Sequence, residues 1–161
     1  MRIGVGVGSF GGGDGGIDSQ VEQTVIAEAD GFQAAWFTHI LGADSLISVA
    51  LAGQATSRIE LVTGVIPVYS REPLLMAQQA LTAQSVADGR LTLGIGLAHP
   101  ETAPRTWNHS YQKPAQFMYE YLAVLQPLLN EQTVEFQGDM ICTSASLELV
   151  GVTPPSILLA A

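Results

Sequence analysis

The stretch Ile59-Glu60-Leu61-Val62-Thr63-Gly64-Val65-Ile66-Pro67-Val68 is rich in aliphatic and β-branched side chains. Such a run predicts a strand, and the absence of clean polar–apolar alternation predicts that both faces of the strand are buried. Three other runs share this character, at residues 3–8, 34–38 and 91–97. Strands that are buried on both faces are typical of a parallel sheet in an α/β protein.

A helix-like segment follows each of the strand-like runs. We expect the first helix to begin near Ser19, because Ser19-Gln20-Val21-Glu22 fits a capping box. Asp30-Gly31 predicts its end, with the glycine just past the last turn. Further helices are predicted over residues 44–56, between Ser70 and Gly89 with Pro73 in the first turn, and over residues 114–130.

The remaining segment predicts a short β excursion over residues 133–149, with a turn at Gln137-Gly138-Asp139, and a fifth buried strand at residues 156–160. Alternating strands and helices predict an α/β fold with right-handed crossovers. Two architectures stay open at this point. One is a five-stranded doubly wound sheet, and the other is a (β/α)8 barrel truncated after about five strands, since a whole barrel takes ~250 residues.

The composition excludes several classes of protein. Of the 161 residues, 47% are hydrophobic and 13% are charged, which excludes a disordered chain. Six Lys and Arg residues against 15 Asp and Glu residues give a net charge of −9, so binding to nucleic acid through a basic surface is not expected. No apolar run reaches the ~18–20 residues of a membrane span. The first residues do not resemble a signal peptide, and we expect a cytoplasmic protein.

Metal and disulfide chemistry are not expected either. Cys142 is the single cysteine, which excludes an intrachain disulfide and a cysteine-based zinc cluster. The three histidines have no carboxylates at ligand spacing, so we predict no metal site.

A glycine motif near the start of the chain matches a nucleotide-binding pattern. Gly6-Val7-Gly8-Ser9-Phe10-Gly11 fits G-x-G-x-x-G after a predicted strand. In dinucleotide-binding folds the helix begins inside this motif, whereas here further glycines disfavour a helix before about Asp18. The second strand also ends in Thr38-His39, where an acidic residue would bind the ribose. We therefore interpret the motif as a glycine loop above the first strand, suited to a lid or a substrate entrance.

Polar or unusual residues fall at the carboxyl ends of the predicted strands, where α/β folds place their chemistry. His39 follows the second strand, Gly64-Val65-Ile66-Pro67 closes the third, and His99 follows the fourth. Histidine suits acid/base work near neutral pH, although a lone histidine often only packs or forms hydrogen bonds. The glycines of Gly94-Ile95-Gly96 either let a neighbour pack closely or leave room for a flat ligand. His109 lies in a polar loop and is expected to be exposed.

Several motifs occur in order along the chain, at residues 54–69, 77–82, 89–97, 110–115, 120–122 and 153–155. Through them, and most clearly in Gly89-Arg90-Leu91-Thr92-Leu93-Gly94-Ile95-Gly96-Leu97, the chain resembles bacterial-luciferase-like flavin oxidoreductases. The resemblance is closest to the branch that uses the deazaflavin coenzyme F-420, and it covers essentially the whole chain. It implies a luciferase-like (β/α)8 barrel, of which residues 1–161 are a single domain and the N-terminal portion.

The resemblance also implies roles for individual residues. His39 matches the position where F-420 enzymes often carry a histidine that acts as an acid or base or polarises the substrate. The acidic residue that often precedes this histidine is Thr38 here. Gly64 and Val65 match a bulge of strand three that backs the flavin-type ring, often through a non-proline cis peptide. His99 lies where some relatives place a glutamate that acts on the substrate or the cofactor.

On this basis we expect an oxidoreductase, or the N-terminal part of one, that transfers a hydride between F-420 and a small organic substrate. FMN is the alternative cofactor and would allow luciferase-like monooxygenation. A second alternative is a non-catalytic partial barrel that serves as a binding or assembly module, because open sheet edges invite pairing. The resemblance implies a homodimer. The substrate and the direction of hydride transfer stay open.

Overall fold

The computed structural model describes residues 3–8, 16–39 and 41–160. Its main sheet is parallel. When β3 and β4 are taken as two parts of one interrupted strand, which both pair with β5, neighbouring strands follow one another in chain order. This confirms the α/β prediction and the order expected of a barrel. The strands are β1 (Gly4–Val7), β2 (Ala34–Phe37), β3 (Glu60–Thr63) with β4 (Ile66–Pro67), β5 (Leu91–Gly96) and β8 (Ser156–Ala160).

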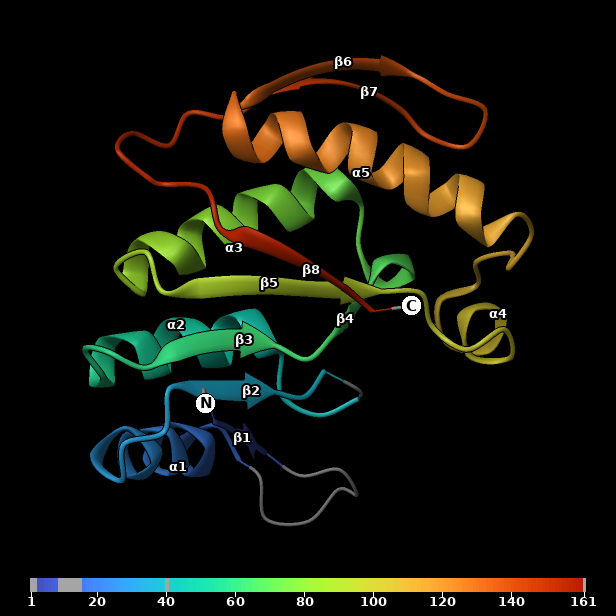
Figure 1. Cartoon of the computed structure of the whole chain (residues 1–161). Helices are drawn as coiled ribbons and strands as arrows, with labels where there is room; N and C mark the ends of the chain where they lie inside the picture. Colours follow the sequence, from blue (N-terminus) through green and yellow to red (C-terminus); the bar gives the residue numbers. More distant parts are fainter. Residues whose placement is uncertain (1–2, 9–15, 40, 161) are drawn as a thin grey trace.

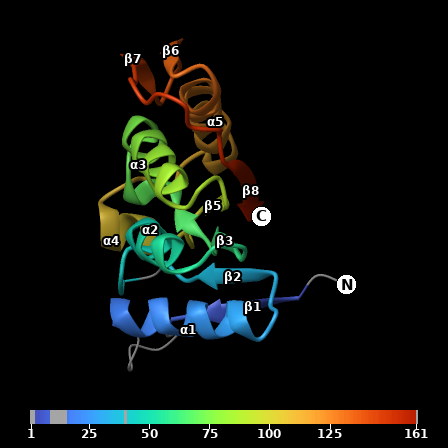
Figure 2. The same cartoon turned by 90° about the vertical axis from the view of Figure 1, so that its left-hand side faces the viewer.

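The long helices lie on one face of this sheet, as Figures 1 and 2 show. On the other face Trp36 is 37% exposed and Leu159 is 48% exposed. Burial on both faces therefore holds for the central strands β3 and β5. It is wrong for β1, β2 and β8 because the described helices cover one side only. The helices are α1 (Ile17–Ala29), α2 (Ser45–Ala55), α3 (Pro73–Val86) and α5 (Pro114–Asn130).

Most helix ends follow their sequence signals. α2 begins after Asp44, whose side chain accepts hydrogen bonds from two backbone N–H groups of the first turn. α1 is the exception, because it begins at Ile17 with Gly16 at the N-cap and no side-chain cap. The capping box predicted at Ser19 is therefore wrong. The Ser19 hydroxyl lies inside the helix and accepts a hydrogen bond from the Gln23 amide at 3.1 Å.

Strand three is interrupted at Gly64 and Val65, where the aliphatic run predicted one continuous strand and the family resemblance implied a bulge. From Val62 to Ile66 the chain advances four residues, while β5 advances three residues from Thr92 to Ile95. The extra residue makes a β-bulge. A single 3-10 turn, η1 (Val68–Ser70), follows β4 and leads toward α3.

Two further elements lie outside the alternating order. A short helix, α4 (Thr102–Trp107), follows β5 where a polar loop was expected. β6 (Thr133–Gln137) and β7 (Cys142–Ser146) form the predicted β excursion, an antiparallel hairpin on the outer side of α5 in Figure 1. Glu120 of α5 holds this hairpin, since its carboxylate accepts two backbone N–H bonds from the turn at 2.8 and 2.9 Å. Among the described helices, none has the length and apolar character needed to cross a membrane.

Candidate active site

The bulge in strand three is held by the side chain of Thr63, which is fully buried. Its hydroxyl donates to the carbonyl of Gly94 and accepts the N–H of Gly94, both at 2.8 Å. A Cβ at Gly94 would lie 1.9 Å from the Thr63 carbonyl oxygen, and one at Gly96 would lie 3.1 Å from a methyl of Val65. Gly94 and Gly96 of β5 therefore allow close packing of the bulge, which is the first of the two interpretations of the motif Gly94-Ile95-Gly96.

The bulge itself lies at the carboxyl end of β3, beside the end of β2. The peptide bond between Gly64 and Val65 is cis, and both residues are partly exposed. The N–H of Gly64 donates to the carbonyl of Phe37 at 2.8 Å, which ties the bulge to the last residue of β2. A Cβ at Gly64 would lie 3.2 Å from the indole ring of Trp36. This part of the site is therefore a surface of backbone and indole ring.

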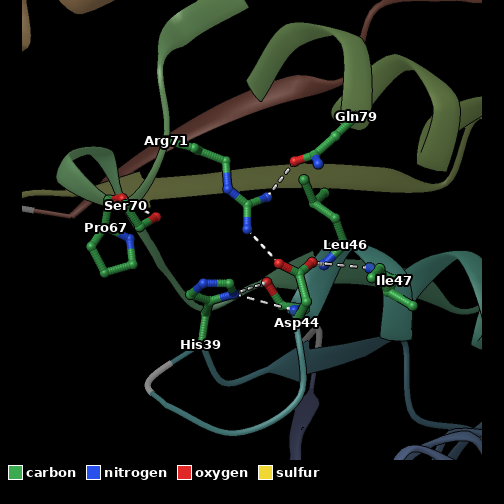
Figure 3. Close-up of polar contacts among 9 residues, drawn as sticks. His39, Asp44, Leu46, Ile47, Pro67, Ser70, Arg71 and Gln79 are labelled. Carbon is green, nitrogen blue, oxygen red and sulfur yellow. Dashed lines mark hydrogen bonds and ion pairs between the residues drawn. The ribbon is translucent and has the colours of Figure 1, made fainter. Parts of the chain in front are cut away.

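His39 follows β2 at the same end of the sheet and contacts the first residue of α2 (Figure 3). Its Nδ1 atom lies 2.9 Å from the Ser45 hydroxyl and accepts the backbone N–H of Ser45 at 3.2 Å. Ser45 is fully buried, and His39 is half-buried. The start of α2 therefore holds the imidazole ring from one side.

An ion pair lies next to this histidine. Asp44, the N-cap of α2, pairs with Arg71, and Arg71 also donates to Gln79 of α3 at 2.8 Å (Figure 3). The Arg71 side chain is only 9% exposed. The Tyr121 hydroxyl donates to the Arg71 carbonyl at 3.0 Å. The network thus joins the segments that follow β2 and β4 to helices α3 and α5.

These neighbours set the ionisation of His39. Burial lowers the pKa of His39 below its usual 6.5, Arg71 lowers it as well, and Asp44 opposes them. Burial acts to raise the pKa of Asp44, but the Arg71 guanidinium holds that pKa below its ordinary value. At neutral pH the site therefore contains an uncharged imidazole beside a carboxylate and a guanidinium that neutralise each other.

The other two histidines have different surroundings from His39. His99 is exposed beyond the end of β5, and its carbonyl accepts the N–H that starts α4. His109 is half-buried, with its ring centroid 5.7 Å from that of Tyr69 and 6.4 Å from that of Phe117. The expectation that His109 is exposed is therefore wrong, because aromatic rings from distant segments cover it. His109, Tyr69 and Phe117 line a cavity of about 350 Å³ together with Trp107 and Tyr121.

The structure brings part of the predicted site together. His39, Gly64 and Val65 lie at the ends of adjacent strands, and His99 follows the next strand of the sheet. The sequence reasoning missed Ser45 and Arg71 altogether. Their signals were an Asp-Ser pair at a helix start and a lone arginine just before the helix-opening Pro73.

Two other predictions concern ligand motifs. Residues 9–11 of the glycine motif and the glycines that follow up to residue 15 lie outside the described residues, whereas Gly6 and Val7 belong to β1. Within residues 3–8, 16–39 and 41–160, no three His, Cys, Asp or Glu side chains are placed to hold a metal ion.

A partial barrel of parallel strands with a polar site at their carboxyl ends defines the class of fold. The sequence model of the family described as luciferase-like monooxygenase matches residues 1–161, and the chain belongs to this family.

Among the relatives, a Mycobacterium tuberculosis protein named as a coenzyme F-420-dependent oxidoreductase is 28% identical over 126 residues, 78% of this chain and 36% of the relative. The 5,10-methylenetetrahydromethanopterin reductase of Methanolobus tindarius is 28% identical over 117 residues, 72% of this chain and 36% of the enzyme. The matched part is therefore about a third of the length of these relatives, and it corresponds to their N-terminal part.

Solved structures show the same fold. The coenzyme F-420-dependent tetrahydromethanopterin reductase from Methanopyrus kandleri has a TM-score of 0.79 at 21% identity, covering 99% of this chain and 50% of that enzyme. The FMN complex of the oxygenating constituent of 3,6-diketocamphane monooxygenase from Pseudomonas putida has a TM-score of 0.82 at 17% identity, covering 99% and 51%. The chain is thus a partial luciferase-like barrel of 161 residues.

Proposed function

We propose that the chain is the N-terminal part of an oxidoreductase that transfers a hydride between coenzyme F-420 and a small organic substrate. The observation that carries the proposal is the uncharged, half-buried His39 beside the bulge of strand three. The Nδ1 atom of His39 forms hydrogen bonds with Ser45, and no described residue forms a hydrogen bond with the Nε2 atom. The relatives named for F-420 support the choice of cofactor.

The residues of the site fit a flat ring system. Gly64 carries no side chain, Val65 packs against the glycines of β5, and both residues are partly exposed at the carboxyl end of the sheet. We propose that Gly64 and Val65 back the ring, and that His99 contacts the cofactor or the substrate from the next strand end. Bound F-420 would supply the hydride chemistry, while the protein supplies position and electrostatics.

In this proposal His39 is the catalytic residue. It hydrogen-bonds the reacting polar group of the substrate through the ring nitrogen that Ser45 does not contact. Its lowered pKa keeps the imidazole uncharged at neutral pH. Asp44 and Arg71 hold the start of α2, and through Ser45 they act as positioning residues.

Titration of oxidised F-420 and of FMN into the full-length protein and the 161-residue chain tests the proposal. Binding of F-420 in preference to FMN supports it. If the protein binds FMN and not F-420, the proposal is replaced by that of an FMN-dependent monooxygenase. If the protein is folded and binds neither cofactor, the result favours the non-catalytic module. Gly64→Ala should weaken binding, because its Cβ would crowd Trp36 at 3.2 Å. Gly42→Ala is the matched control, since its Cβ would meet open space.

The 161-residue chain alone should bind either cofactor weakly and turn over negligibly. One face of its sheet lies open, so water reaches the site and weakens the electrostatic contacts that a bound ring needs. Binding at micromolar concentration or tighter would contradict this expectation and would show that the partial barrel works by itself.

We also propose that the protein is a homodimer that pairs through α2 and α3. Ile47, Leu51 and Leu75 are each more than a third exposed and line a mostly apolar groove of about 440 Å³ between these helices. A second copy would remove this apolar surface from water. Light scattering should show a monomer for Ile47→Glu and an unchanged dimer for Tyr119→Glu, which alters an exposed site on α5. The cytoplasmic location stays a prediction, which cell fractionation tests.

A further inference from the structure

We infer that Ser45 holds His39 as the neutral imidazole with its proton on Nε2, so that His39 is a hydrogen-bond donor and not a general base. For the identity of the group that His39 contacts, the inference rests on the proposed function. The position of the proton follows from the contacts of this chain alone.

The decisive contact is the backbone N–H of Ser45, which points at Nδ1 over 3.2 Å. A backbone N–H only donates, so Nδ1 must present its lone pair. In a neutral ring the proton is then on Nε2. The Ser45 hydroxyl lies 2.9 Å from Nδ1 and can turn its hydrogen toward or away from the ring. It is therefore compatible with either tautomer, and the backbone N–H decides between them.

The other tautomer is disfavoured by burial. A proton on Nδ1 would face the N–H of Ser45 and leave that N–H without an acceptor. Ser45 is fully buried, with an exposed fraction of 0%, so water cannot reach this N–H. A buried, unpaired N–H is costly, and the partial positive charge at the start of α2 also opposes a proton on Nδ1. The charged groups near the ring, Asp44 and Arg71, pair with each other.

The consequence concerns the substrate. Ser45 contacts the ring at Nδ1, so Nε2 is the other ring nitrogen, and a general base at this position would need a lone pair there. An Nε2–H group instead fits an oxygen acceptor, as in a carbonyl compound. Reduced deazaflavin would supply the hydride to the carbonyl carbon and would itself be oxidised, while the C=O electron pair would move to oxygen and a solvent proton would complete the alcohol. The Nε2–H bond would stabilise the charge that develops on that oxygen.

The backbone conformation at Ser45 permits a test by substitution with proline. Ser45 is the first residue of α2, a position that tolerates proline, and Asp44 before it has φ −67° and ψ 122°, as proline requires of its predecessor. α3 and α5 already begin with Pro73 and Pro114. Ser45→Pro replaces the N–H that faces His39 with the Cδ of the proline ring, which displaces the imidazole from this contact because Nδ1 lies 3.2 Å from the Ser45 nitrogen. Ser45→Ala removes only the hydroxyl. Ile17→Pro makes the matched change at the first residue of α1, after an extended Gly16.

The measurement is a long-range proton–nitrogen NMR correlation on the nitrogen-15-labelled 161-residue chain. It distinguishes a protonated from an unprotonated ring nitrogen, and His39→Asn assigns the His39 signals among the three histidines. We expect the Nε2–H tautomer in the wild type, in Ser45→Ala and in Ile17→Pro. Ser45→Pro should show a mixture of both tautomers.

A wild-type His39 with its proton on Nδ1, or with averaged signals, would overturn the inference. A Ser45→Pro variant that folds and keeps the wild-type pattern would overturn it as well. If Ser45→Pro does not fold, the wild-type spectrum still decides. These outcomes are independent of cofactor titrations, whose failure would overturn the proposed function and leave the tautomer assignment standing.

Discussion

The two ends of the parallel sheet use charged side chains in different ways. At the amino ends, Arg90 donates four hydrogen bonds of 2.7–3.2 Å to acceptors on Gly53, Thr56 and Ile59. Nearby, the Glu28 carboxylate accepts backbone N–H bonds from residues 57–59. Both side chains hold the loop between α2 and β3, and most of their hydrogen-bond partners are backbone groups.

At the carboxyl ends, Asp44 and Arg71 neutralise each other and surround a histidine that keeps one ring nitrogen without a bond to any described residue. A polar side chain whose hydrogen bonds are all formed within the protein adds rigidity to the fold. A side chain that keeps one hydrogen-bonding atom without a protein partner can form a hydrogen bond with a ligand. The difference matches the general pattern of barrels, in which the amino face serves stability and the carboxyl face serves chemistry.

The largest effect of breaking this pattern is expected from Arg90→Ala at the amino end. The substitution removes four hydrogen bonds and leaves three backbone carbonyls to find water. We expect the free energy of unfolding to fall by about 2–4 kcal/mol, measured by urea denaturation. Arg58→Ala, which removes an exposed neighbouring arginine, should cost much less. Equal losses in the two variants would mean that the bonds of Arg90 carry no special weight.

The next largest loss of stability is expected from Thr63→Val, which removes the hydroxyl that holds the bulge near the carboxyl end of the sheet. Valine has nearly the shape of threonine but leaves the N–H and carbonyl of Gly94 without their partner at the buried bulge. We expect a loss of about 2 kcal/mol in the free energy of unfolding. Thr24→Val, at another fully buried threonine whose hydroxyl bonds only within α1, is the control. A wild-type stability for Thr63→Val would show that the bulge does not depend on this hydroxyl.

Glu28→Gln is expected to cost about 1 kcal/mol at neutral pH, because a neutral amide is a weaker acceptor for the backbone of the loop. Burial acts to raise the pKa of Glu28, but the N–H groups of Ile59, Arg58 and Ser57 bring it below the ordinary 4.5. A lowered folded pKa stabilises the protein above the unfolded value, and this contribution is lost as the pH falls through the folded pKa. The difference between wild type and variant should therefore shrink below about pH 4. Denaturation curves at neutral and acidic pH test this, and a constant difference would contradict it.

A small shift in the pKa of His39 is expected from Asp44→Asn at the carboxyl end. Asparagine still caps a helix, but Arg71 loses its charge partner and the negative charge that raises the pKa of His39 is removed. The pKa of His39 should therefore fall further, as an NMR titration of the histidine signals can measure. A rise in this pKa would show that Asp44 does not act on His39 through its charge.

Elements with local signals could be predicted from the sequence. α5 occupies residues 114–130 and β8 occupies residues 156–160, as predicted, because Pro114 opens the helix and Pro154-Pro155 delimits the strand. The positions of His39, Gly64 and His99 at the carboxyl ends followed from the order of strands. Such signals act over a few neighbouring residues, so a single sequence contains them.

Only the tertiary structure decided how these positions are connected. The hydroxyl of Thr63 meets Gly94 across 31 residues of chain, and the Arg71 carbonyl meets Tyr121 across 50. The covering of His109 by Tyr69 and Phe117 likewise joins segments that are distant in sequence. Residue types and periodicity limit which groups can pair, but the choice of partner depends on which strand and helix ends the packed core brings within hydrogen-bond distance. The sequence therefore determined the strand order and the candidate residues, and packing determined the contacts that hold the bulge, the ion pair and the proton position inferred for His39.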